Sequence, residues 1–176
     1  QSVSIAMQGI ARLNKPQGKR IPTVAMLPRN DVLYFEMRGN YMNYAELVAQ
    51  FSRMAEAKGI VNSLEGNLSM IDRTTGNIYI TPSHKAKSLL TAEDICVVAP
   101  GGEQIGGRGK KSSEFFLHEA AYATRPDCNA VLHCHVPYLS AYAFAYRDFQ
   151  TDPDTFLHKI FGTIQCLPYG EHGTHD

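Results

Sequence analysis

Short strand and helix signals alternate along this chain, and their order is the feature that most constrains its fold. The strand signals are brief apolar runs bounded by turn residues, and the helix signals are longer segments with apolar residues at helical spacing. In chain order the predicted elements are a helix at 43–59, a hairpin at 68–80 around the turn DRTTGN, strands at 95–99 and just after the Gly-Gly turn, a helix at 112–125, a strand at 130–135, a helix at 136–149 and a short strand within 160–169. Mixed short strands with helices between them favour an α/β domain that is layered rather than barrel-like.

Capping and breaking residues mark the ends of the two clearest predicted helices. Asn43 stands where it can cap the first helix, and Gly59 is a residue type frequent at helix C-termini. Ser112 or Ser113 begins the second helix, and Pro126 lies beyond its end. These signals support both helix assignments.

Residues 1–40 are interpreted as an N-terminal arm, because a short apolar start is followed by a basic segment that contains proline and glycine. A solvated basic loop is the favoured interpretation of its charges. Residues 41–176 then hold the α/β domain.

Composition and charge narrow the classes of protein to which the chain can belong. Its 44% hydrophobic and 19% charged residues are an ordinary globular composition, and 176 residues suit one domain. The 17 basic and 17 acidic residues cancel, so charge predicts neither a nucleic-acid partner nor an anionic membrane. No apolar run approaches the ~20 residues that span a bilayer.

Cysteine usage indicates a reducing compartment, and therefore a cytoplasmic location. The cysteines are scattered without a CxxC pair, which predicts free thiols rather than a disulfide framework. They are Cys96, Cys128, Cys134 and Cys166.

The stretch AVLHCH ends a short apolar run with two histidines one residue apart. In an extended strand, side chains at i and i+2 point to the same face, so His133 and His135 share a face and Cys134 lies on the other. Neutral imidazole is the commonest metal-ligand side chain, and two on one face form half of a tetrahedral zinc shell. The alternative is a pair of hydrogen-bonded histidines near a sheet edge, and the spacing alone favours that alternative.

Three further pieces place small polar residues at the mouth of a predicted strand or helix: EGNLS at 65–69, TPSH at 81–84 and KSSE at 111–114. Hydroxyl and amide side chains with free backbone N–H groups form neutral anion cradles, and a helix N-terminus adds a favourable dipole. Each piece also has a structural explanation, since GN is a common turn, TPS a common strand exit and SSE a capping sequence. No single piece therefore predicts a phosphate site on its own.

Glu114 is expected in the first turn of the second helix, where the helix dipole favours a carboxylate by roughly 0.3–1 kcal/mol. His118 lies one helical turn further on, so the two side chains can face the same way. His118 is then either a further site group or a partner that orients neighbouring groups.

The order and spacing of these pieces, within GNLSMIDRTTGNIYITPS, KSSEFFLHEAAYATRP and VLHCHVPYLSAYA, resemble the class II aldolase/adducin family. The resemblance runs from about residue 43 to the C-terminus. It implies a three-layer α/β/α sandwich with a central, mostly antiparallel sheet, assembled as a homotetramer. Family members include fuculose-1-phosphate and rhamnulose-1-phosphate aldolases and ribulose-5-phosphate 4-epimerase, so a sugar phosphate is the small-molecule substrate that the resemblance implies.

The resemblance also implies a role for each matching residue. His133 and His135 match the two zinc histidines of the family's HxH motif, and Glu114 matches its catalytic acid/base. The positions that match the phosphate-binding residues are Gly66, Asn67, Thr81, Ser83, Ser112 and Ser113. One zinc ion, or another divalent metal, is expected per subunit.

Together these roles imply a metal-dependent lyase or epimerase that acts on a ketose phosphate, with retro-aldol C–C cleavage through a metal-stabilised enediolate. The same parts serve aldol cleavage, epimerisation and dehydration, so the reaction branch stays open. A catalytically inactive, adducin-like protein-binding module is the alternative from another class. A plain structural domain with coincidental histidines is the third interpretation.

Two positions depart from the family pattern. His84 stands where glycine is usual in TPSG, and its side chain either crowds a bound phosphate or adds a donor to it. The family's third zinc histidine follows a segment like YGEHGTHD, whereas this chain stops at Asp176, although a catalytic zinc normally keeps three protein ligands. The chain is therefore interpreted as a fragment that lacks its C-terminal part, or as a member that has lost the third ligand. The remaining candidates for that ligand are His158, His172 and His175.

Overall fold

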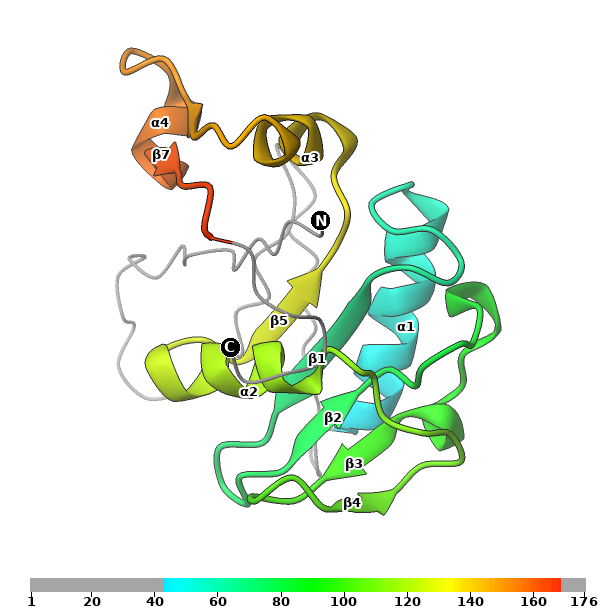
Figure 1. The fold of residues 1–176 in the computed structure, drawn as a ribbon. Coiled ribbons are helices and arrows are strands. Elements are labelled where there is room, and N and C mark those ends of the chain that lie inside the picture. The colour runs from blue at the N-terminus through cyan, green and yellow to red at the C-terminus, as the bar shows by residue number, and fades with distance from the viewer. Residues whose placement is uncertain (1–42, 169–176) are drawn as a thin grey trace.

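The computed structural model describes residues 43–168 (Figure 1). The expected N-terminal arm, residues 1–40, and the tail histidines His172 and His175 lie outside the described residues. In chain order the elements are α1 (Tyr44–Ala57), β1 (Asn67–Ile71), β2 (Ile78–Ile80), the 3₁₀ turns η1 (Lys87–Leu89) and η2 (Ala92–Asp94), β3 (Cys96–Val98), β4 (Gln104–Gly106), α2 (Phe115–Thr124), β5 (Ala130–His133), α3 (Pro137–Phe144), β6 (Phe149–Gln150), α4 (Phe156–Phe161) and β7 (Thr163–Ile164).

Five short strands form one sheet in the order β4–β3–β2–β1–β5, and every neighbouring pair is antiparallel. β1 and β2 form the predicted hairpin, whose turn is closed by a hydrogen bond from Asp72 N to Asn77 O at 2.9 Å. β5 pairs with the other edge of β1, so that Asn67 stands opposite His133. The strand order therefore brings the histidine strand beside the start of β1.

Helix α1 covers one face of this sheet (Figure 1). Apolar side chains of the helix, of β1 and of the segment before β3 are buried together in this contact, and they are Val48, Ala49, Leu68, Met70, Leu90 and Ile95. The helix ends as predicted. Asn43 Oδ1 accepts the N–H of Glu46 at 3.1 Å, and Gly59 follows the helix with a φ of +68°, a left-handed value suited to glycine.

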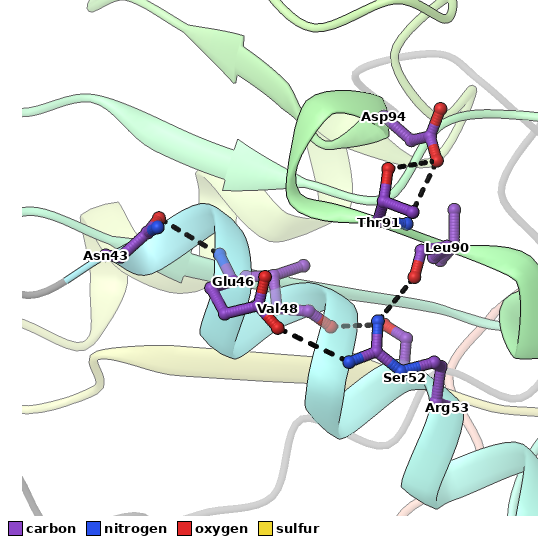
Figure 2. Close-up of polar contacts among 8 residues, drawn as sticks. All are labelled: Asn43, Glu46, Val48, Ser52, Arg53, Leu90, Thr91 and Asp94. Atoms are coloured by element: carbon purple, nitrogen blue, oxygen red, sulfur yellow. Dashed lines mark hydrogen bonds and ion pairs between the residues drawn. The ribbon is translucent and has the colours of Figure 1, made fainter.

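A hydrogen bond joins α1 to the segment that carries η1 and η2, and further polar contacts lie within each of the two (Figure 2). Arg53 Nη1 donates to Leu90 O, and Arg53 Nη2 lies 3.4 Å from Glu46 Oε1. In η2, Asp94 Oδ2 accepts from both the N–H and the hydroxyl of Thr91, each at 2.9 Å. These contacts hold the connection between β2 and β3 in a defined shape against the helix.

Helix α2 covers the opposite face (Figure 1). Its Phe115 and Tyr122 are buried with apolar residues of four strands, namely Ile71, Ile78, Ile80, Cys96, Val98 and Val131. Because side chains alternate along a strand, β1 turns Leu68 toward α1 and Ser69 toward α2. The fold is therefore the expected α/β/α sandwich around an antiparallel sheet.

Beyond β5 the chain leaves the sheet and forms α3, α4 and a separate two-stranded ribbon of β6 and β7 (Figure 1). Helix α3 lies within the helix predicted at 136–149. The short strand predicted within 160–169 is β7, whereas helix α4 before it is absent from the sequence-based expectation. The hydroxyl of Thr155 accepts the N–H of His158 at 3.3 Å and Gly162 ends the helix, so two local caps outweigh the apolar pattern.

All four cysteines are free thiols, as predicted, and Cys96 and Cys134 are buried. Within residues 43–168, every helix is too short or too polar to cross a membrane.

Candidate active site

The four polar segments singled out in the sequence meet at one end of the sheet. β1 begins at Asn67, opposite His133 of β5. Thr81 lies just beyond β2, and its N–H donates to Leu68 O of β1 at 3.0 Å. Pro82 then pairs with Lys111 in an isolated antiparallel bridge. Strand pairing thus brings EGNLS, TPSH, KSSE and HCH together from distant parts of the chain.

His133 and His135 turn their imidazoles toward one another, as their spacing predicts. Their Nε2 atoms lie 3.2 Å apart, with the ring planes at 87°. Two nitrogen ligands about 2.1 Å from a tetrahedral zinc ion are about 3.4 Å apart, so the pair has the separation of two ligands on one ion. The same distance also allows one ring N–H to donate to the other nitrogen, so the hydrogen-bonded alternative has the same geometry. Cys134 is buried on the other face, beside Ala55 and Val61.

A third metal ligand does not join this pair within the described part of the chain. Residues 43–168 hold no group of three or more His, Cys, Asp or Glu side chains placed to bind a metal ion. His158 lies in α4, its Nδ1 is 2.9 Å from Thr151 Oγ1, and it belongs to no such group. The two imidazoles suit zinc or another divalent ion that takes nitrogen ligands.

Glu114 is the N-cap residue of α2, with φ −85° and ψ 11°, and not a residue of its first turn as the sequence predicts. Its N–H donates to Ser112 Oγ at 3.2 Å. The serine hydroxyl therefore caps the turn that precedes the helix, which moves the helix start to Phe115. This corrects the expectation that Ser112 or Ser113 is the N-cap.

Gly66 occupies a position that only glycine fits. Its φ is +79°, and a Cβ there would lie 2.9 Å from His133 O and 2.7 Å from Val61 Cγ1. The absence of a side chain lets β1 enter the sheet in direct contact with the backbone of the histidine strand.

The remaining members of the predicted phosphate set differ in how they are placed. Ser83 Oγ donates to Lys111 O at 3.1 Å, which ties TPSH to KSSE. Thr81 is fully buried, and its hydroxyl accepts the N–H of Leu68 at 3.3 Å. Ser113 is exposed. Thr81 therefore supports the strand end from inside, whereas Ser113 faces solvent.

His118 is fully buried beneath this end of the sheet. Its Nδ1 lies 2.7 Å from Ser69 Oγ, and its Nε2 is hydrogen-bonded to Asn67 Oδ1. Burial, and to a smaller extent the nearby His133, lower the pKa of His118 to about 3. The imidazole is therefore neutral at physiological pH. His84, by contrast, is exposed and has a φ of +56°.

Three buried polar residues near the site have no role of their own in the sequence-based expectation, although Ser69 lies within EGNLS. Ser69 and Tyr122 form a 2.7 Å hydrogen bond beside His118, and Lys87 Nζ lies 3.4 Å from Leu64 O. Two weak signals exist for the first pair. Ser69 stands two residues after Asn67 on one strand face, and Tyr122 stands four residues after His118 on one helix face.

Residues 46–176 match the family model described as the Class II Aldolase and Adducin N-terminal domain. The chain is similar to the 5-deoxy-D-ribulose 1-phosphate aldolase of Bacillus thuringiensis serovar kurstaki, with 32% identity over 130 residues, which are 73% of this chain and 60% of the relative. It is also similar to the L-ribulose-5-phosphate 4-epimerase UlaF of Salmonella paratyphi B, with 33% identity over 108 residues, which are 61% of this chain and 47% of the relative.

A solved structure of an L-fuculose 1-phosphate aldolase has the same fold. The TM-score is 0.69 at 23% identity, and the match covers 77% of this chain and 63% of that chain. The chain thus spans about 60% of the length of the aldolase relative and under half that of the epimerase.

Proposed function

This chain belongs to the class II aldolase and adducin family, and from that premise we propose that it acts on a ketose phosphate as a metal-dependent lyase or epimerase. The observation that carries the proposal is the histidine pair with Nε2 atoms 3.2 Å apart, of which His133 stands opposite Asn67 among the polar segments. The names of the two relatives, an aldolase and a 4-epimerase of pentulose phosphates, support the substrate class.

His133 and His135 would hold one divalent metal ion per subunit, through the nitrogen atoms that already face each other. Such an ion, when bound, polarises the carbonyl and hydroxyl oxygens of a ketose. His133 is held by the β5–β1 pairing, so the sheet itself sets the position of the first ligand. His135 lies two residues beyond the end of the strand and is exposed, which leaves its side chain accessible.

Glu114 would serve as the acid/base. In its ionised form it can take the proton of the hydroxyl beside the carbon–carbon bond that breaks, and then return a proton to the carbon left behind. Its place at the N-cap of α2 puts it next to Ser112, in the segment that the Pro82–Lys111 bridge ties to the site.

The substrate phosphate would be held by amides and hydroxyls without a formal positive charge. Asn67 supplies an amide, and Ser112 and Ser113 supply hydroxyls just before α2. Gly66 lets β1 begin against the backbone of His133, which sets the position of Asn67. Thr81 and Ser83 would keep these segments in register through their bonds to β1 and to Lys111.

We also propose a cytoplasmic homo-oligomer, a tetramer by resemblance. The four free thiols support a reducing compartment. Exposed aromatic side chains on α3 and α4 support contacts between subunits, and they are Tyr138, Tyr142, Phe144, Phe156 and Phe161.

The proposal is tested by elemental analysis of the purified protein and by assay of ketose 1- and 5-phosphates. We expect about one divalent metal per chain and cleavage or epimerisation of one such substrate. Glu114→Gln should lower kcat by about 10²–10⁴-fold while metal content stays constant. His135→Ala should remove both metal and activity.

His158→Ala is the matched control, since it removes a histidine bonded to Thr151 and should change neither quantity. Full activity in both Glu114→Gln and His135→Ala would overturn the proposal. Absence of metal and of turnover in the wild-type protein would favour the adducin-like binding module instead.

A further inference from the structure

A continuous chain of buried hydrogen bonds runs from α2 to the start of β1. Tyr122 Oη lies 2.7 Å from Ser69 Oγ, and Ser69 Oγ lies 2.7 Å from His118 Nδ1. His118 Nε2 is in turn bonded to Asn67 Oδ1. Ser69 and His118 are fully buried, and Tyr122 and Asn67 are 3% and 8% exposed. Four polar side chains in a sheet–helix interface are costly unless each bond is satisfied, so their arrangement has a defined direction.

The direction of the chain follows from its last member. Asn67 Oδ1 can only accept a hydrogen bond, so His118 Nε2 carries the proton and donates to it. A neutral imidazole protonated on Nε2 accepts at Nδ1, so Ser69 donates its hydroxyl proton there. Ser69 Oγ then accepts the hydroxyl proton of Tyr122.

The hydrogen bond from His118 Nε2 to Asn67 Oδ1 decides which end of the Asn67 amide remains for a ligand. A carboxamide presents an acceptor oxygen on one side and a donor NH₂ on the other, and only the donor side can bind an anion. Because Asn67 Oδ1 is engaged by His118, the NH₂ group is the side of the amide that remains for a ligand, at the end of the sheet where Asn67 stands opposite His133.

We propose that His118, oriented by Ser69 and Tyr122, is a positioning residue that fixes the Asn67 amide with its NH₂ group toward the phosphate of the substrate. The choice of phosphate as the ligand rests on the proposed function above, whereas the orientation of the amide rests on the hydrogen bonds alone. A flipped amide would present its oxygen to the anion and repel it.

Two measurements on the full chain test this inference. The first is the tautomer of His118, read from ¹⁵N–¹H correlation spectra of the imidazole, for which we expect the Nε2–H form. The second is the affinity for inorganic phosphate, measured by titration calorimetry, for wild type, Tyr122→Phe, His118→Leu and His118→Gln.

We expect Tyr122→Phe and His118→Leu to weaken phosphate binding by about tenfold, because the amide is no longer held in one orientation. His118→Gln should restore most of the affinity, since its amide N–H can replace the Nε2–H donor. Metal content should be the same in all variants. Tyr79→Phe is the control, because it removes a phenol from the other side of the sheet, where the ring stacks on Tyr44.

An Nδ1–H tautomer of His118 would overturn the inference, and so would equal phosphate affinity in wild type and Tyr122→Phe. If His118→Leu fails to fold, the isosteric Tyr122→Phe still decides the matter. Absence of phosphate binding and of turnover in the wild type would overturn the proposed function and the assigned ligand. In that case the tautomer of His118 would still test the orientation of the Asn67 amide, because that measurement needs no bound phosphate.

Discussion

Gly66 and His84 both have left-handed backbone conformations at this end of the sheet, and only the first is a glycine. Gly66, at φ +79°, is enclosed by His133 and Val61, whereas His84, at φ +56°, is exposed on the surface. A left-handed conformation costs a residue with a Cβ roughly 1–2 kcal/mol. At position 84 the family pattern TPSG has a glycine, which would avoid that cost. His84 is therefore a strained residue beside the candidate phosphate site.

We expect His84→Gly to raise the free energy of unfolding by about 0.5–1 kcal/mol, because relief of the strain exceeds the entropy that an added glycine costs. Urea denaturation measures the change. His84→Ala is the matched control, since it removes the imidazole but keeps the Cβ, and it should give no gain. Equal free energies of unfolding for His84→Gly and His84→Ala would show that the left-handed backbone at position 84 does not destabilise the protein.

Gly66→Ala is expected to have the opposite effect. The new methyl group adds left-handed strain and contacts within 3 Å of His133 O and Val61 Cγ1, so we expect a loss of about 3 kcal/mol. A thermal melt compares it with Gly59→Ala, where φ is +68° but nothing lies within 4 Å of the new Cβ. A loss no larger than that of Gly59→Ala would contradict the tight packing at β1.

At the scale of elements, the connection between β2 and β3 depends on one buried carboxylate. Asp94 closes η2 by accepting from Thr91, and its other oxygen lies 2.6 Å from Lys85 Nζ, with the Asp94 side chain only 6% exposed. The hydrogen bond from Lys85, followed by those from Thr91, lowers the pKa of Asp94 from 3.8 to about 2. The ionised form is therefore the one that stabilises this turn against α1.

We expect Asp94→Asn to lower the free energy of unfolding by about 2 kcal/mol at neutral pH. Because the pKa in the folded state, about 2, lies below the unfolded value of 3.8, the contribution is complete above about pH 4 and is lost as the pH falls toward 2. Urea denaturation across this range measures the difference from wild type. Asp127→Asn, which breaks an exposed pair with Arg125, should cost less at neutral pH. A difference that did not shrink in acid would argue against the ion pair.

At the scale of the whole molecule, patterns within short segments of the sequence predict most helices and strands. The hydrogen bonds of the candidate site join residues far apart in the sequence, and these are not predicted. Helix α1 and the β1–β2 hairpin are predicted because caps, turns and periodicity lie within each segment. The place of Glu114 is missed because Ser112 caps the preceding turn instead of the helix. The bonds of Ser69 to His118 and Tyr122 join residues 49 and 53 positions apart, so only the packing of α2 on the sheet reveals them.

Under the proposed function, the histidine pair would link metal binding to the stability of the entire sheet, because His133 belongs to β5 and β5 is held by β1. A ligand that binds only the folded state adds stability by mass action, about 2.7 kcal/mol at a concentration a hundredfold above its Kd. We therefore expect zinc to raise the Tm of the wild-type protein and a chelator to reverse the rise. His135 is exposed, so His135→Ala should leave the metal-free Tm nearly unchanged while abolishing the response to zinc. His158→Ala should keep the full response, since that histidine is bonded to Thr151. A zinc-induced rise that persists in His135→Ala would place the metal elsewhere and leave the pair as two histidines sharing a hydrogen bond.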